Sequence, residues 1–170
     1  MRMLCEKREH ESKLPGVRLP EDMKITADLE DSLQDPDVAV LAVPSPFTRS
    51  TAHRMAPFVK KGQIIVNVAK GVEEHTLMTL SEIISEEIPQ ADVCVLSGPS
   101  HAEEVGKGLP TTCVVSAEKR ETAEYLQGDL YEPCFPCVYH SGYSGSRAWR
   151  RAEKRDRPCG RNSGRSGIWR

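Results

Sequence analysis

The sequence has few aromatic residues and no long hydrophobic run. Only 5% of its 170 residues are Phe, Trp or Tyr. The longest apolar runs, Val38–Val43 and Ile64–Ala69, are far shorter than the roughly 20 residues that cross a bilayer. The opening segment MRMLCEKREHE contains no apolar core of a signal peptide. We therefore expect no membrane span, and nothing in the sequence indicates secretion.

Acidic and basic residues are distributed unevenly along the chain. Residues 1–140 contain 14 Lys and Arg against 23 Asp and Glu, whereas residues 141–170 contain 9 against 2. The second segment also has one Ile and no Leu, Val, Met or Phe, so it cannot build a hydrophobic core. We predict a folded region, 1–140, followed by a disordered basic tail, 141–170.

The six cysteines are scattered. Cys94 and Cys113 lie in apolar, strand-like runs, where a thiol acts as a small hydrophobic group. This use of cysteine indicates a reducing cytoplasm. Cys134 and Cys137 form a single CxxC, with no second pair and no His at zinc spacing, so we predict no metal site.

Strands and helices are expected to alternate after Asp37. The expected strands are continuous apolar runs, which suit a parallel sheet covered on both faces: Val38–Val43, Ile64–Ala69, Val93–Ser97 and Cys113–Ser116. Amphipathic, helix-length stretches lie between or after them: Phe47–Val59, Thr76–Ile88, Ser100–Lys107 and Glu118–Tyr131. Earlier in the chain we expect a turn-rich loop, a short strand at Met23–Thr26 and a short helix at Asp28–Leu33. This pattern predicts an α/β fold made of βαβ units.

Ligands of such sheets bind outside the carboxyl ends of the strands. Lys70 follows the second run and precedes Gly71, where a flexible cation could contact a phosphate or a polarised carbonyl oxygen. The alternative is a lysine that merely extends from a strand end into solvent. Pro44 and Ser45 follow the first run in a turn that lets the backbone lie flat against a ring or a ribose.

The turn after the third run begins an expected helix. Ser100 and Glu103 match a capping box, in which each side chain bonds to the backbone N–H of the other residue. The same helix start could hold an anionic substrate, with Gly98 leaving room for it. His101 could act as an acid or base but has no predicted partner, and the acidic residues 103–104 are already favoured there by the helix dipole.

Together these turns resemble a known enzyme family. The strings LPGVRLPEDMKITADLEDSL, VAVPS, VNVAKGVE and above all LSGPSHAEEVGKGLPTT are similar, in order and spacing, to NAD(P)-dependent glycerol-3-phosphate dehydrogenase of the bacterial type. The resemblance runs from about Lys13 to about His140. It implies a Rossmann-type, doubly wound parallel sheet that binds NAD or NADP and interconverts dihydroxyacetone phosphate and sn-glycerol 3-phosphate, the entry to phospholipid synthesis.

The resemblance also implies roles for individual residues. Lys70 would contact both cofactor and substrate. Gly98 and Ser100 would bind the substrate, while Ala102, Pro44 and Ser45 would lie against the cofactor. The partner is then a small phosphorylated molecule rather than a nucleic acid. No catalytic residue is assigned, because the family's catalytic lysine lies in a Gly-Gly-Ala-Leu-Lys-Asn segment that this sequence does not contain.

Two departures from the family pattern point to an incomplete Rossmann-type sheet. No G-x-G-x-x-G phosphate loop occurs, so we expect the chain to begin beyond that loop and its strand. The tail replaces the family's helical segment, and we attribute it to a frameshift near Ser141. Read one base later, permitted codons for Ala148 to Arg157 allow Leu-Gly-Gly-Ala-Leu-Lys-Asn-Val-Ile. The Arg-rich tail then reflects GC-rich codons rather than a nucleic-acid partner.

These departures leave two functional hypotheses. In the first, the chain is a fragment of a glycerol-3-phosphate dehydrogenase that is inactive alone. In the second, it is a non-catalytic Rossmann-like binding or interaction module, which could associate with another copy through an exposed sheet edge.

The frameshift hypothesis predicts the content of the genomic DNA. The shifted frame after Ser141 should spell the lysine-bearing segment, and the DNA upstream should encode an in-frame G-x-G-x-x-G. Sequencing across both junctions checks this, and DNA with neither feature rejects the hypothesis.

Overall fold

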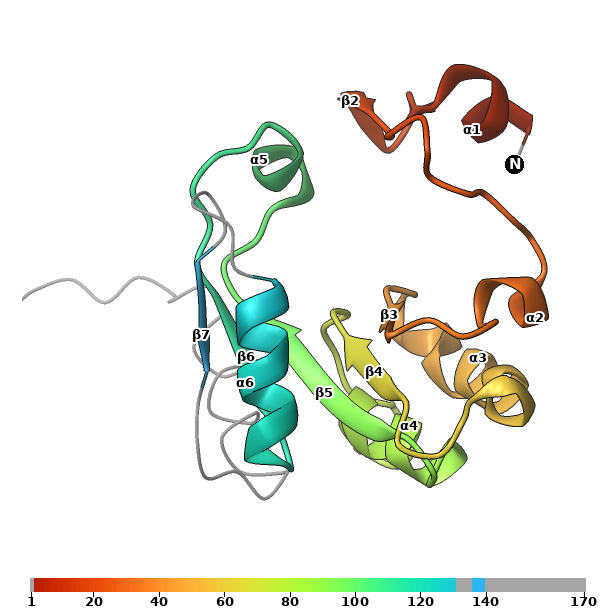
Figure 1. Ribbon diagram of the computed structural model, residues 1–170, viewed down its shortest axis with the longest axis vertical. Coiled ribbons are helices and arrows are strands. Elements are labelled where there is room, and N and C mark those ends of the chain that lie inside the picture. The colour runs from red at the N-terminus through yellow and green to blue at the C-terminus, as the bar shows by residue number, and fades with distance from the viewer. Residues whose placement is uncertain (1, 131–135, 140–170) are drawn as a thin grey trace, which may run out of the picture.

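The computed structural model describes residues 2–130 and 136–139 of the chain. A five-stranded sheet flanked by helices dominates it (Figure 1), which confirms the predicted Rossmann-type α/β fold class. The predicted tail, residues 141–170, and Cys134 lie outside the described residues. In chain order the elements are α1 (Arg2–Lys7), β1 (Glu9–His10), β2 (Leu14–Arg18), α2 (Leu29–Ser32), β3 (Val38–Leu41), η1 (Ser45–Phe47), α3 (Thr48–Met55), η2 (Ala56–Phe58), β4 (Ile64–Asn67), α4 (Leu80–Glu87), β5 (Asp92–Ser97), α5 (Ala102–Gly106), β6 (Cys113–Ala117), α6 (Arg120–Asp129) and β7 (Cys137–Tyr139).

The strands of the main sheet lie in the order β3-β4-β5-β6-β7. β3, β4 and β5 are parallel, and Val38, Ile64 and Asp92 share one register row. β6 is antiparallel to β5, with Val95 opposite Ser116, and β7 is parallel to β6. The predicted strands therefore exist, but the prediction of an all-parallel sheet is wrong at Cys113–Ser116.

The reversal of β6 follows from the path of the connection before it. A parallel connection must carry the chain back along a face of the sheet, which takes a dozen or more residues and usually a helix. The connection, residues 98–112, is long enough for this, but its helix α5 has only five residues and none of them is buried, so it does not pack on a face of the sheet. The chain therefore leaves the sheet at Ser97 and enters it again at Cys113 on the same end of the strands, so β6 is antiparallel to β5. α6, by contrast, packs on the sheet and returns the chain for a parallel β7.

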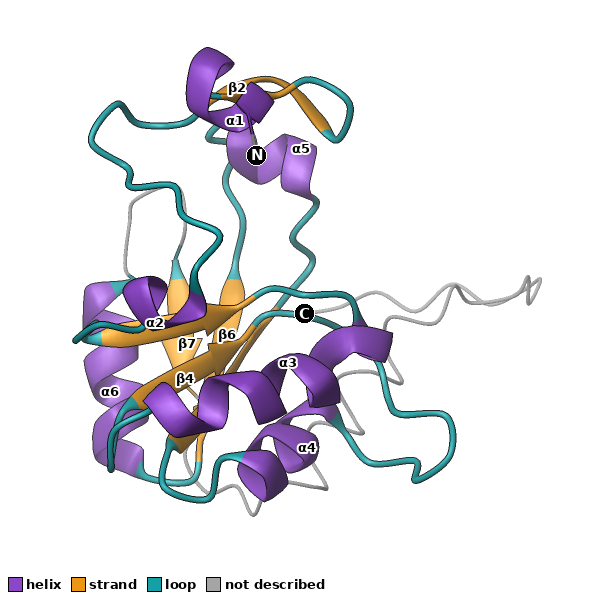
Figure 2. Cartoon of the chain, turned by 90° about the vertical axis from the view of Figure 1, so that its right-hand side faces the viewer, coloured by secondary structure: helices purple, strands orange, loops and turns teal. Residues whose placement is uncertain are grey.

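Helices cover both faces of the sheet, as the continuous apolar strands predict. α3 and α4 cover one face, where the buried residues are Leu33, Ala39, Leu41, Ala52, Met55, Val59, Ile65, Ile84 and Ile88. α6 covers the other face, where they are Val66, Cys94, Cys113, Val115, Ala123, Leu126 and Cys137 (Figures 1 and 2). Neighbouring residues of one strand, such as Ile65 and Val66, thus point into different cores.

The segment before β3 differs from its prediction. Met23–Thr26 forms no strand, and Met23 is half exposed. The extended segment is instead β2, which pairs with β1 and lies against α5 through Val17 and Gly106 (Figure 2). Pairing with β1 and the packing of Val17 against α5 both stabilise β2. The short helix expected at Asp28–Leu33 is confirmed as α2, capped by the Asp28 side chain.

The cysteines in the strands are buried, as predicted. Burial raises the pKa of the Cys94 thiol to about 12 and also raises the pKa of Cys113 and of Cys137. Because the thiolate is the reactive form, these residues act as apolar packing groups. Within residues 2–130 and 136–139, no three His, Cys, Asp or Glu side chains gather as metal ligands would. The helices described here are all too short or too polar to cross a membrane.

The core on the α6 face predicts the effect of a single truncation. Leu126→Ala removes a fully buried side chain, and we expect it to lower the free energy of unfolding by about 2–5 kcal/mol. Leu109→Ala, at a half-exposed position, is the matched control and should change stability by about 0.5 kcal/mol or less. Urea denaturation followed by circular dichroism measures both, and equal costs would contradict packing of α6 on the sheet.

Candidate functional site

The three candidate turns meet at one end of the sheet, where β3, β4 and β5 have their carboxyl ends. We call this end of the strands the turn edge. β3, β4 and β5 are adjacent and parallel, so their carboxyl ends lie side by side (Figure 1). The turn with Pro44 follows β3, the turn with Lys70 follows β4, and the turn with Gly98 follows β5. This edge is where ligands of parallel α/β sheets bind.

Lys70 connects the second turn to the third. Its side chain is exposed, and its Nζ donates a hydrogen bond to the carbonyl oxygen of Gly98 at 2.9 Å. An ammonium group has three donors in a compact charge, so the same group can also hold an anion or a polarised oxygen. The juxtaposition of Lys70 and Gly98, expected from strand order, is therefore present.

Gly71 connects the second turn to the first. Its φ of 139° is rarely adopted by other residues. A β-carbon added to it would lie 2.9 Å from Ser45 Cβ and 3.0 Å from Ser45 Oγ. Ser45 therefore packs directly against the backbone next to Lys70, and the three turns form one continuous edge.

Gly98 is required by the packing of the sheet. A β-carbon there would lie 2.5 Å from the carbonyl oxygen of Thr112 and 3.0 Å from the α-carbon of Cys113. These are backbone atoms of the strand entering the sheet as β6, and they cannot move aside cheaply. The close approach of two chains thus explains this glycine without a ligand.

The predicted capping box at Ser100 is wrong. α5 begins at Ala102, its N-cap is His101, and no side chain caps it. The Ser100 hydroxyl instead lies 3.5 Å from the carbonyl oxygen of Gly98, to which it donates, so it turns back toward β5. Ser100 and Ala102 are both exposed beside the edge that Lys70 reaches. Glu103 lies in the first turn of α5, where the helix dipole favours an acidic residue.

A capping box does form elsewhere, at the start of α4. The Thr79 side chain accepts from the backbone N–H of Glu82 at 3.4 Å, and Glu82 accepts from the backbone N–H of Thr79 at 2.8 Å. The sequence Thr-Leu-Ser-Glu carries the same signal as the Ser100 segment and could have identified it. This box fixes the end of the loop that carries Lys70.

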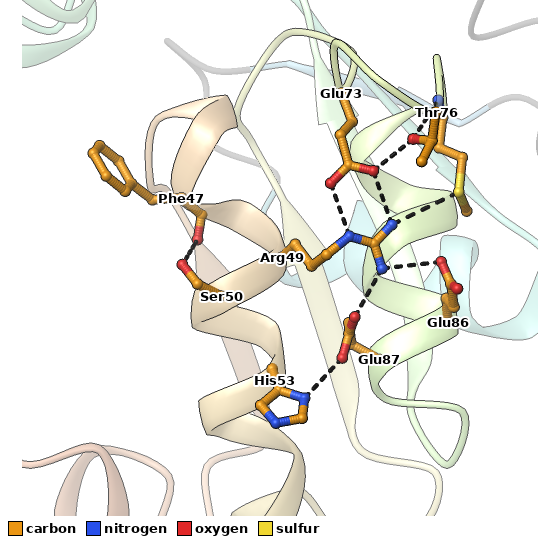
Figure 3. Close-up of polar contacts among 9 residues, drawn as sticks. Phe47, Arg49, Ser50, His53, Glu73, Thr76, Glu86 and Glu87 are labelled. Carbon is orange, nitrogen blue, oxygen red and sulfur yellow. Dashed lines mark hydrogen bonds and ion pairs between the residues drawn. The ribbon is translucent and has the colours of Figure 1, made fainter.

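Sequence reasoning missed the largest polar cluster near the edge. Arg49, in α3, binds both carboxylate oxygens of Glu73 and also contacts Glu86 and Glu87 in α4 (Figure 3). Hydrogen bonds from Arg49, and then from Thr76, lower the pKa of Glu73 to about 2. No linear spacing signals the cluster, because Arg49 and Glu73 are separated by 24 positions.

The described residues also enclose a cavity of about 130 Å³ away from this edge. It is lined by Asp92, Lys119 and their neighbours at the amino end of β5. None of the predicted site residues lines it. The candidate site is therefore an open edge of turns, and its assignment depends on the chemistry of Lys70 and the backbone around it.

Comparisons with known proteins identify the family that this chain resembles. Residues 1–123 match the family model described as the NAD-dependent glycerol-3-phosphate dehydrogenase N-terminus. The glycerol-3-phosphate dehydrogenase (NAD(P)+) of Agathobacter rectalis is 61% identical over 129 residues, which are 76% of this chain and 38% of that protein. The corresponding protein of Fusobacterium nucleatum is 52% identical over 130 residues, which are 75% of this chain and 39% of that protein. This chain thus spans about two fifths of the length of these relatives.

A solved structure is similar over the same part of the chain. The crystal structure of glycerol-3-phosphate dehydrogenase from Coxiella burnetii has a TM-score of 0.77 and 26% identity. The match covers 82% of this chain and 43% of that one. The mixed sheet described above therefore has a counterpart among solved dehydrogenases.

The packing of Gly98 predicts the result of a glycine substitution. Gly98→Ala places a methyl group against the β6 backbone, and we expect it to destabilise the fold by roughly 1–3 kcal/mol, the range typical of overpacking. Gly128→Ala, in α6 with nothing within 4 Å, is the control and should stabilise by about 0.4–1 kcal/mol. Thermal unfolding of both variants tests this, and a neutral Gly98→Ala would show that the close approach is not real.

Proposed function

The chain belongs to the NAD-dependent glycerol-3-phosphate dehydrogenase family, and from that membership we propose that its turn edge binds NAD or NADP together with glycerol 3-phosphate or dihydroxyacetone phosphate. The observation that carries the proposal is the hydrogen bond from Lys70 Nζ to Gly98 O. It holds a cation at the sheet edge where an anionic substrate would need one.

Each predicted residue has a role in this proposal. Lys70 contacts the phosphorylated substrate and the cofactor, and Gly98 and Ser100 contact the substrate through backbone and hydroxyl groups. Pro44, Ser45 and Ala102 lie against the dinucleotide. The fit is supported by the packing of Ser45 on Gly71, since two small residues in contact leave a flat surface at the edge.

The chemistry divides between the cofactor and the chain. When bound, a reduced nicotinamide cofactor would donate a hydride to the carbonyl carbon of dihydroxyacetone phosphate, and an oxidised one would accept a hydride from the alcohol carbon of glycerol 3-phosphate. Lys70 holds the substrate by its charge and stabilises negative charge that develops on the substrate oxygen. The lysine that would supply the proton lies in a Gly-Gly-Ala-Leu-Lys-Asn segment, which these 170 residues do not contain. We therefore propose that they bind ligands without turnover.

A second candidate function is an interaction module that pairs with another copy. Within the part of the chain that the structure describes, β3 pairs with β4 on one side and with no strand on the other. Val40 in the middle of β3 has 59% of its surface exposed. An edge strand with an exposed apolar residue is a template for pairing with another strand.

Ligand titration tests the proposed function. We expect glycerol 3-phosphate to bind the chain, and Lys70→Met to weaken the binding about tenfold or more, because a charge-assisted hydrogen bond contributes about 1.5–3 kcal/mol. Lys61→Met, in the exposed turn before β4 at the opposite edge, is the matched control and should bind as the wild type does. Isothermal titration calorimetry measures all three proteins.

Three outcomes would contradict parts of the proposal. Equal binding by Lys70→Met and the wild type would remove Lys70 from the site. A folded chain that dimerises and binds neither glycerol 3-phosphate nor NADH would favour the interaction module. Oxidation of NADH with dihydroxyacetone phosphate at the rate of an ordinary dehydrogenase would overturn the proposed lack of turnover.

A further inference from the structure

The loop that carries Lys70 has no apolar anchor of its own. It runs through residues 69–78, from the residue after Val68, which packs against the core on the α6 face, to the residue before the N-cap of α4, and none of these residues is buried. Val72 is 45% exposed and Leu77 is 74% exposed. A loop of this length without buried side chains would normally be mobile, so polar contacts must define its conformation.

The two ends of the loop are held locally. At the start, the Asn67 side chain donates to the carbonyl oxygen of Ala69 at 3.0 Å and accepts from its N–H at 3.2 Å. At the end, the capping box of Thr79 and Glu82 fixes the first turn of α4. Neither contact reaches the middle of the loop, where Glu73 lies.

Arg49 reaches this middle from α3. Its Nε donates to Glu73 Oε1 at 2.8 Å, and its Nη2 donates to Glu73 Oε2 at 2.9 Å (Figure 3). A guanidinium that binds both oxygens of one carboxylate fixes the orientation of the pair as well as its distance. The side chains are only partly exposed, 32% for Arg49 and 22% for Glu73, so water competes less than it does for an open surface pair.

The third guanidinium nitrogen of Arg49, Nη1, bonds to α4. Nη1 donates to Glu87 Oε1 at 2.8 Å and to Glu86 Oε2 at 3.1 Å, and His53 contacts the other oxygen of Glu87 at 3.0 Å. α4 therefore fixes the guanidinium, and the guanidinium in turn fixes the loop. Without Arg49, Glu73 and the two α4 carboxylates would lose the guanidinium that bonds to all three.

The contact with Glu73 is transmitted to the turn with Lys70 by the backbone. The N–H of Glu73 donates to Met78 O at 3.0 Å, and the N–H of Leu77 donates to Glu73 O at 2.9 Å, so Glu73 joins both arms of the loop. Glu73 is three residues from Lys70. The segment that carries Arg49 also begins at Ser45, which packs against Gly71. One segment, η1 with α3, thus supports the loop on both sides of Val72.

We propose that Arg49 is a positioning residue, which holds the loop through Glu73 so that Lys70 stays at the carbonyl of Gly98, ready for the substrate. The substrate part of this inference rests on the proposed function. The alternative is that Arg49 only joins α3 to α4 through Glu86 and Glu87. The two ideas differ in what loosens when Arg49 is replaced: the loop alone, or the packing of both helices.

Amide hydrogen exchange distinguishes the two ideas. We expect Arg49→Met to speed exchange of the Glu73 and Leu77 amides roughly tenfold, with the fold otherwise intact. The amide of Ile88, bonded to Ile84 O in α4, and that of Val68, bonded to Leu41 O, should not change. Arg49→Lys keeps the charge without the two-pronged geometry, so it should recover part of the protection.

The matched control is Arg120→Met, which removes an exposed ion pair with Glu124 in α6 and should leave every loop amide unchanged. Unchanged loop amides in Arg49→Met, or an equal acceleration of the Ile88 and Val68 amides, would overturn the positioning role.

Binding of glycerol 3-phosphate provides the second measurement. Apparent affinity is proportional to the fraction of molecules with the loop in place, so Arg49→Met should weaken binding by the factor by which this fraction falls, and Arg49→Lys should restore part of it. If the wild type binds and Arg49→Met binds equally well, the positioning role is overturned. If the wild type does not bind, the proposed function fails, while hydrogen exchange still decides whether Arg49 holds the loop.

Discussion

The parallel alignment of β3, β4 and β5 is the constraint on which the candidate site depends. Because three neighbouring strands point the same way, their carboxyl ends deliver three turns to one edge. Ser45 then packs against Gly71, where an added β-carbon would clash, and Lys70 donates a hydrogen bond to the carbonyl oxygen of Gly98. The two cores on either face of the sheet serve this edge, since they keep the strands in register.

Two kinds of contact complete the edge, and they differ in how far they reach. Local contacts hold the chain next to each strand end, as Asn67 does at Ala69. The second kind spans distant segments, as the guanidinium of Arg49 does between α3, the loop and α4 (Figure 3). A flexible cation such as Lys70 can bind a substrate only where the backbone that carries it is held in place. The proposed site therefore depends on the long-range contact of Arg49, although Arg49 itself does not line the site.

The strands and the placement of the candidate turns at their ends could largely be predicted from the sequence. Apolar runs identified β3, β4, β5 and β6, and the rule that ligands bind beyond parallel strands selected Lys70 and Gly98. The choice of capping box failed because Ser100 and Thr79 begin equally good motifs. Only the path of the backbone decides whether the side chain of Ser100 or that of Thr79 caps a helix. β7 was missed because three residues after a proline carry too little periodicity.

The buried strands, the residues at their ends and the resemblance to the dehydrogenase family can all be inferred from the amino-acid sequence. They can be inferred because periodicity, turn chemistry and residue order are local properties of the chain. The antiparallel pairing of β6 with β5 and the ion pair between Arg49 and Glu73 become visible only in the folded protein. The direction of a strand depends on whether its connection can cross the sheet, and an ion pair depends on which side chains the fold brings together. Neither is written in the spacing of residues.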